Sequence, residues 1–170
     1  MRFYGAGRRP GALSWCVVAG SYNPRVDDIK RKAGERGRSL KLPYAGALLP
    51  GEAHLLMQQG AKLVDVRTEP ELQYVGSIPG SETIEWNTYP QGARNPNFLS
   101  ELEKVAPKEQ PVMFICRSGA RSHHAAVAAT QAGWKEAYNV LEGFEGDKDA
   151  EGHRNTVGGW RFARLPWLQG

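Results

Sequence analysis

One short segment holds the residues best suited to chemistry. It spans residues 116–122, follows an apolar run and precedes an alanine-rich stretch; its sequence is CRSGARS. A thiol between a buried strand and a helix N-terminus lies where backbone N–H groups converge and the helix dipole favours negative charge. Two guanidinium groups in the same segment add positive charge. We therefore expect Cys116 to be a nucleophilic thiolate and not an inert core residue.

The length of this loop distinguishes two kinds of chemistry. Cysteine-dependent phosphatases have a longer loop, which forms a ring wide enough for a phosphate dianion. Here only four residues lie between Cys116 and Arg121. The smaller loop favours a single anionic sulfur, carried as a persulfide on Cys116, over phosphoryl transfer.

The elements around the loop are those of an α/β protein. Short apolar runs alternate with helical stretches, which is typical of a mainly parallel sheet. The sequence predicts strands over residues 62–66, 83–86, 111–115 and 137–141, and helices over residues 50–59, 69–74, 98–105 and 121–132. The 111–115 strand is apolar throughout, as central strands buried on both faces tend to be. Ligands bind at the carboxyl ends of such strands, which is where Cys116 stands.

Charge divides the chain in two. Residues 1–42 hold ten Lys or Arg and three Asp or Glu, a net charge of +7, whereas the remaining residues carry −3. We expect a flexible basic extension over residues 1–42 and one domain over residues 43–170. Because the positive charge belongs to the extension, nucleic-acid binding by the domain is not expected. No apolar run is long enough for a transmembrane helix, so no membrane association is expected.

The cysteines bear on the compartment. Cys16 and Cys116 are too few and too far apart for a disulfide framework, and a reactive thiol suits a reducing compartment. A cytoplasmic location is therefore expected. Export is the alternative, with residues 1–20 acting as a signal, because Arg8 and Arg9 precede a short apolar stretch.

The segment resembles the active-site loop of the rhodanese family, whose pattern is cysteine, two residues, glycine, one residue, arginine, and then serine or threonine. Upstream, residues 65–67 (DVR) resemble a second signature of the family. Residues 76–81 (GSIPGS) resemble its Gly-His-Ile-Pro-Gly-Ala turn, with Ser77 and Ser81 replacing histidine and alanine. The resemblance covers about residues 45–168. It implies a rhodanese-like three-layer sandwich with a mainly parallel central sheet flanked by helices.

The resemblance also implies a function, that of a thiosulfate sulfurtransferase. Sulfane sulfur passes from thiosulfate or another donor to a thiol, cyanide or protein acceptor through a persulfide on Cys116. No cofactor beyond this persulfide is expected. The residues expected to bind the substrate and the persulfide are Arg117, Ser118, Gly119, Ala120 and Arg121. Among them, we expect Arg117 to bind the donor and Ser118 to donate a hydrogen bond to the persulfide.

Four further residues are expected to support the loop: Asp65, Arg67, Glu71 and Ser122. The family role of Asp65 and Arg67 is to hold the loop and its neighbouring turn. Glu71 is the expected partner of Arg67. Arg121 is expected either to bind substrate or to brace the loop against an acid such as Asp65. Ser122 is expected to cap the helix.

Two other functions stay open. The first is a persulfide carrier that passes sulfur to a protein partner without turnover on small donors. The second is a cysteine-dependent phosphatase or arsenate reductase, which the loop length disfavours. No metal is expected, because His123 and His124 point about 100° apart on a helix and no histidine spacing suits zinc.

Overall fold

The computed structural model describes residues 23–170, which form a parallel sheet of five strands in the order β1-β5-β4-β2-β3. The strands are β1 (Gly46–Leu48), β2 (Lys62–Asp65), β3 (Glu82–Thr83), β4 (Val112–Ile115) and β5 (Ala137–Val140). The helices are α1 (Pro24–Ser39), α2 (Pro50–Gln58), α3 (Glu69–Tyr74), α4 (Phe98–Val105) and α5 (Ala120–Gln131). None of these helices has the length and apolar character needed to cross a membrane.

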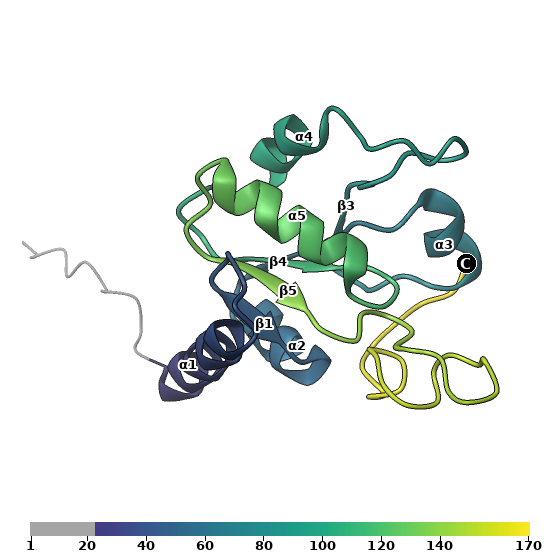
Figure 1. The fold of residues 1–170 in the computed structure, drawn as a ribbon, viewed down its shortest axis with the longest axis horizontal. Coiled ribbons are helices and arrows are strands. Elements are labelled where there is room, and N and C mark those ends of the chain that lie inside the picture. The colour runs from purple at the N-terminus through teal and green to yellow at the C-terminus, as the bar shows by residue number, and fades with distance from the viewer. Residues whose placement is uncertain (1–22) are drawn as a thin grey trace, which may run out of the picture.

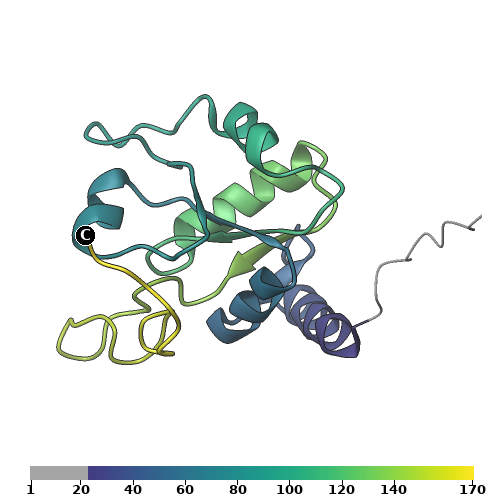
Figure 2. The ribbon, with the colours of Figure 1, turned by 180° about the vertical axis from the view of Figure 1, so that it is seen from behind.

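Helices cover both faces of the sheet, as predicted (Figures 1 and 2). We call the side covered by α4 and α5 the α4–α5 face, and the opposite side the α1–α2 face. Successive side chains of a strand point to opposite faces, and β4 contributes to both cores. Val112 and Phe114 pack on the α4–α5 face, whereas Met113 and Ile115 pack on the α1–α2 face. This double burial explains why β4 is apolar throughout.

Most predicted elements are confirmed to within one or two residues at each end. The four predicted helices correspond to α2, α3, α4 and α5. Pro50 opens α2, and Gly60, with a φ of +96°, follows its end as a residue suited to the left-handed region. The strand predicted over 83–86 is shorter, because only Glu82–Thr83 pair regularly with β2. Beyond them, the N–H groups of Ile84 and Trp86 still donate to carbonyls of residues 65 and 66.

The prediction of a flexible extension over residues 1–42 is wrong for its second half, since α1 occupies residues 24–39. Asn23 caps the helix by accepting a hydrogen bond from the Arg25 N–H. One narrow stripe, Ile29, Ala33 and Gly37, is buried, and the remaining surface is highly charged. So narrow an apolar stripe gives a weak periodic signal. Residues 1–22, including Cys16 and the possible signal, lie outside the described residues.

Close backbone contact attaches α1 to β1, a strand that the sequence analysis did not predict. A Cβ at Gly46 would lie 2.5 Å from the carbonyl carbon and oxygen of Ala33. A strand of three residues is too short to show an alternating pattern, so β1 is defined by its neighbours, β5 and α1.

The chain after β5 crosses the α1–α2 face and ends beside α3 (Figures 1 and 2). Trp160 is fully buried there, and its indole N–H donates to the Pro166 carbonyl. Ser77 and Leu168 then form an antiparallel bridge. This C-terminal segment, residues 141–170, therefore belongs to the domain and reaches the edge of the sheet where Cys116 lies.

The contact between α1 and β1 predicts that Gly46→Ala destabilises the protein. The added methyl group overlaps the backbone of Ala33, and overpacking of this kind costs about 1–3 kcal/mol. The matched control is Gly51→Ala in α2, where a Cβ meets nothing within 4 Å. Urea unfolding should show a lower midpoint for Gly46→Ala and an unchanged or higher midpoint for Gly51→Ala. Equal stabilities would mean that α1 is not tightly packed on β1.

Candidate active site

The sulfur of Cys116 lies at the carboxyl end of β4 and accepts two hydrogen bonds. The Gly119 N–H donates to Sγ at 3.1 Å and the Ser122 hydroxyl donates at 3.2 Å. Gly119 is the N-cap of α5 and has a φ of +106°, a conformation that glycine adopts without strain. Cys116 is only 1% exposed. The two donors and the helix N-terminus therefore stabilise negative charge on a shielded sulfur.

Of the two serines in the loop, Ser122 has a different role from the one predicted. Ser122 does not cap α5, because Gly119 holds that position and the Ser122 side chain is buried against the sulfur. The expectation of a helix cap is therefore wrong. Ser118 is half-buried, and its hydrogen bond to a persulfide stays a prediction.

The backbone of the loop is held by residues that the sequence analysis did not single out. The Phe144 N–H donates to the Cys116 carbonyl at 2.8 Å, and the Glu145 N–H donates to the Arg117 carbonyl at 2.9 Å. Gly143 permits this approach, since a Cβ there would lie 2.5 Å from the Cys116 carbonyl oxygen. The signal in the sequence was the glycine itself, next to the end of a predicted strand. Gly143 and Phe144 thus join the C-terminal segment to the loop.

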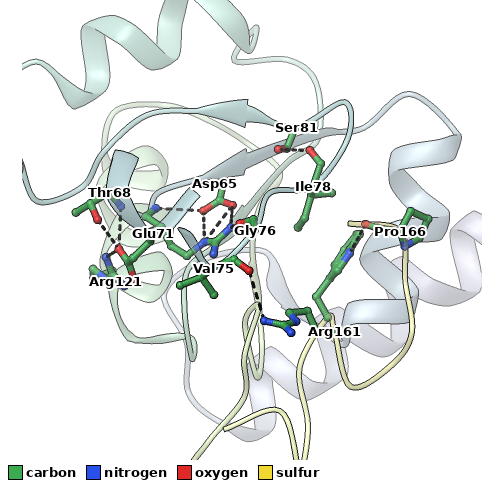
Figure 3. Close-up of polar contacts among 12 residues, drawn as sticks. Asp65, Thr68, Glu71, Val75, Gly76, Ile78, Ser81, Arg121, Arg161 and Pro166 are labelled. Atoms are coloured by element: carbon green, nitrogen blue, oxygen red, sulfur yellow. Dashed lines mark hydrogen bonds and ion pairs between the residues drawn. The ribbon is translucent and has the colours of Figure 1, made fainter. Parts of the chain in front are cut away.

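Asp65, which is labelled in Figure 3, forms a fully buried ion pair with Arg67 at the end of β2, opposite the end of β4 that leads into the loop. The Arg67 Nε donates to Asp65 Oδ1 at 2.9 Å, and its NH2 group donates to Oδ2 at 2.6 Å and to the Gly76 carbonyl at 2.9 Å. The guanidinium also stacks on the Phe144 ring, 4.1 Å from the centroid. The pair therefore connects the end of β2 with the 76–80 turn and with Phe144 of the C-terminal segment, whose N–H donates to the Cys116 carbonyl. The prediction that Glu71 pairs with Arg67 is wrong.

Glu71 instead pairs with Arg121, the last arginine of the loop. Two parallel hydrogen bonds of 2.8 and 2.7 Å join their side chains, and the Thr68 N–H and hydroxyl donate to the same carboxylate (Figure 3). Arg121 therefore braces the loop against an acid, as one of the two predictions held, but that acid is not Asp65.

The pair shifts the pKa of both partners. Burial raises the pKa of Glu71, but hydrogen bonds from Arg121 and Thr68 and the charge of Arg121 outweigh it and hold the pKa at about 2. The hydrogen bonds with Glu71 raise the pKa of Arg121 further, assisted by the charges of Glu71, Cys116 and Asp65 and opposed by burial. Both groups are therefore charged throughout the physiological range.

Arg117 differs from the other arginines near the sulfur. Its side chain is exposed and makes no ion pair or hydrogen bond with residues 23–170. Among the loop residues, it is the charged group left available to a ligand.

A cavity of about 670 Å³ lies between the segment after β3 and α4, lined by residues such as Glu85, Tyr89 and Lys104. None of its lining residues belongs to the Cys116 loop. We assign the chemistry to the loop and not to this cavity, because the cavity lining includes neither Cys116 nor the residues that donate to its sulfur.

Comparison with known proteins agrees with this geometry. Residues 49–150 match the model of a family described as the rhodanese-like domain. Uncharacterized protein RP600 of Rickettsia prowazekii is 34% identical over 115 residues, which cover 66% of this chain and 87% of that protein. Thiosulfate sulfurtransferase GlpE of Haemophilus influenzae is 29% identical over 102 residues, which cover 58% and 84%.

Two solved structures are similar to this one. The crystal structure of Rv0390 from M. tuberculosis has 47% sequence identity and a TM-score of 0.68, and covers 75% of this chain and 99% of that chain. The polysulfide-sulfur transferase homodimer of Wolinella succinogenes has 22% identity and a TM-score of 0.51, with 86% and 85% covered. The second similarity concerns the fold alone.

The Glu71–Arg121 pair predicts a specific pH dependence of stability. The pKa of Glu71 falls from 4.5 to about 2 on folding, so the pair stabilises the fold above about pH 4.5 and loses this effect as the pH falls toward 2. Glu71→Gln should lower the free energy of unfolding by about 2 kcal/mol at pH 7. The difference from wild type should shrink as the pH falls below the ordinary carboxyl range.

Urea unfolding across this pH range is the measurement. The control is Glu69→Gln, since Glu69 is an exposed residue of the same helix and forms no ion pair within residues 23–170. A difference in the free energy of unfolding between Glu71→Gln and wild type that did not change with pH would contradict the ion pair.

Proposed function

The chain belongs to the rhodanese-like domain family, and we propose that it is a sulfurtransferase that carries sulfane sulfur as a persulfide on Cys116. The observation that supports this most directly is the pair of hydrogen bonds from Gly119 and Ser122 to Sγ. These donors favour an anionic sulfur, which both the free thiolate and the terminal persulfide sulfur present. The similarity to a thiosulfate sulfurtransferase makes thiosulfate the first donor to test.

In the first step, the Cys116 thiolate attacks the outer sulfur of thiosulfate. A bond forms between Sγ and that sulfur, while the bond between the two sulfurs of thiosulfate breaks. Sulfite leaves with the electron pair, and Cys116 becomes a persulfide anion. No proton moves in this step, so no general base is needed once the thiolate exists.

We assign donor binding to Arg117 and loop positioning to Arg121. Arg117 is exposed and free of partners among the described residues, so its guanidinium can bind the sulfonate oxygens through charge-assisted hydrogen bonds. Arg121 is held by Glu71 through two hydrogen bonds, and a carboxylate already occupies its donors. Binding a sulfonate there would require the ion pair to open.

In the second step, an acceptor removes the outer sulfur. Cyanide attacks the terminal sulfur of the persulfide, thiocyanate leaves, and the Cys116 thiolate is regenerated. A small thiol or a thiolate of a protein partner reacts in the same way. The loop donors stabilise anionic sulfur before and after each step, so they contribute as preorganised electrostatic groups.

This chemistry also bears on cofactor and location. The persulfide is the only carrier that the proposed reaction uses, and we propose no metal. A thiolate that cycles through a persulfide is preserved best in a reducing compartment, so we propose the cytoplasm.

Cys116→Ser should abolish thiocyanate formation from thiosulfate and cyanide. The serine hydroxyl retains the volume but cannot form the persulfide. Incubation with thiosulfate followed by intact-mass measurement should add one sulfur to the wild type and none to the variant. An adduct without turnover would favour a persulfide carrier. A folded, reduced wild type with neither adduct nor turnover would contradict the proposal, and hydrolysis of an aryl phosphate or reduction of arsenate would favour the other alternative.

Arg117→Ala should raise the KM for thiosulfate about tenfold, since it removes a charge-assisted contact to the sulfonate. The control is Arg38→Ala, which deletes the same charge from an exposed position on α1. Steady-state kinetics at constant ionic strength should show a near-wild-type KM for this control. Equal effects of the two substitutions would assign the contribution of Arg117 to net charge alone.

A further inference from the structure

Asn139 is a buried polar residue in the middle of the sheet. It lies in β5, opposite Ala47 of β1 and Phe114 of β4, and is 3% exposed. Tyr138 and Val140 belong to the α1–α2 core, so the alternation along the strand places Asn139 on the α4–α5 face, beneath the start of α5. A polar side chain at such a position is costly unless its hydrogen bonds are satisfied.

One end of the Asn139 amide contacts the catalytic loop, and the oxygen at the other end accepts no hydrogen bond within the described chain. Its Nδ2 group donates to the Gly119 carbonyl at 3.2 Å. Its Oδ1 atom is buried without a hydrogen-bond partner in the described chain. The Tyr44 hydroxyl lies 2.7 Å from His123 Nδ1. Burial raises the pKa of Tyr44, and the Asn139 amide is close enough to the hydroxyl to oppose this rise. Asn139 therefore costs stability that an apolar side chain of similar size would not cost.

The contact with Gly119 concerns the residue that donates to the sulfur. The Gly119 N–H points at Cys116 Sγ, while its carbonyl accepts from Asn139 Nδ2 and from the His123 N–H. Glycine has no side chain to restrict its dihedral angles, so its orientation depends on external contacts. The Gly119 carbonyl accepts two hydrogen bonds. The one from His123 belongs to the first turn of α5, whereas the one from Asn139 connects the carbonyl to the sheet.

We propose that Asn139 is a positioning residue that holds the Gly119 N–H on the sulfur of Cys116 by fixing the Gly119 carbonyl. The expected effect of Asn139 on turnover rests on the proposed function. The geometric link from β5 through Gly119 to the sulfur does not depend on which sulfur donor is used. Asn139 acts through Gly119 and does not itself touch the reacting atoms.

The test is Asn139→Leu, which keeps a similar volume and removes both the donor and the unpaired acceptor. With the Gly119 peptide less restrained, kcat for thiosulfate should fall about tenfold, somewhat less than on direct loss of an oxyanion donor. The KM for thiosulfate should change less than twofold, because Arg117 is untouched. The pH profile of Cys116 alkylation by iodoacetamide should move to higher pH, because the thiolate loses a donor. Thermal unfolding should occur at or above the wild-type temperature.

The matched control is Thr130→Val, which removes a buried hydroxyl that, like Asn139 Oδ1, has no partner in the described chain and lies about three turns along α5 from Gly119. It should retain wild-type kcat and alkylation. Wild-type kcat and an unchanged alkylation profile in folded Asn139→Leu would overturn the proposal. If that variant does not fold, Asn139→Ala adds no new atoms and gives the same readouts.

The alkylation measurement separates this proposal from the proposed function. Iodoacetamide labelling, read on the peptide that contains Cys116 because Cys16 also carries a thiol, reports the state of the Cys116 thiol without any sulfur transfer. A wild type without sulfurtransferase activity would contradict the proposed function, while a shifted alkylation profile in Asn139→Leu would still support the role of Asn139. An active wild type with identical profiles in both variants would contradict the role of Asn139 alone.

Discussion

The buried ion pair between Asp65 and Arg67 is the interaction on which the site depends. Removing one partner of such a pair leaves an uncompensated charge in the interior and costs about 3–5 kcal/mol. Both side chains are fully buried, and the pair is joined to the Gly76 carbonyl and the Phe144 ring. Phe144 in turn donates its N–H to the Cys116 carbonyl. The position of the nucleophile therefore depends on an ion pair at the end of the neighbouring strand β2, where Asp65 lies opposite Ile115 of β4.

The three arginines nearest the site have different roles because their burial and partners differ. Arg67 is inaccessible and serves the fold. Arg121 is partly buried, and Glu71 compensates its charge, so it adds little net attraction for an anion at long range. Arg117 is exposed and uncompensated within the described chain. A site with three free guanidinium groups around the sulfur would bind many anions. Asp65 and Glu71 thus compensate the charges of Arg67 and Arg121. Arg117 is left as the uncompensated charge among these three arginines.

The sequence predicted the parts of the site that local pattern determines. Cys116 and Gly119 stand between an apolar strand and a helix, and both the strand and the helix have strong signals. The pairing of Asp65 with Arg67 was missed, although residues two apart at the end of a strand point to the same side and could have indicated it. The pairing of Glu71 with Arg121 could not have been indicated in this way, because fifty positions separate them and the spacing carries no distance information. Likewise, α1 buries too narrow a stripe and β1 is too short to be detected locally.

The burial of the nucleophile limits the donors that can react. Sγ of Cys116 is nearly inaccessible, whereas Arg117 beside it is exposed. Under the proposed function, a donor that first meets the exposed Arg117 must still bring its sulfur to a buried thiol. Thiosulfate, the donor proposed above, suits this arrangement, because its outer sulfur projects away from the sulfonate oxygens. Shielding from water also strengthens the hydrogen bonds to the sulfur, since they act in surroundings of low polarity. Access and reactivity therefore have the same origin, namely the close packing of the loop against the sheet and the C-terminal segment.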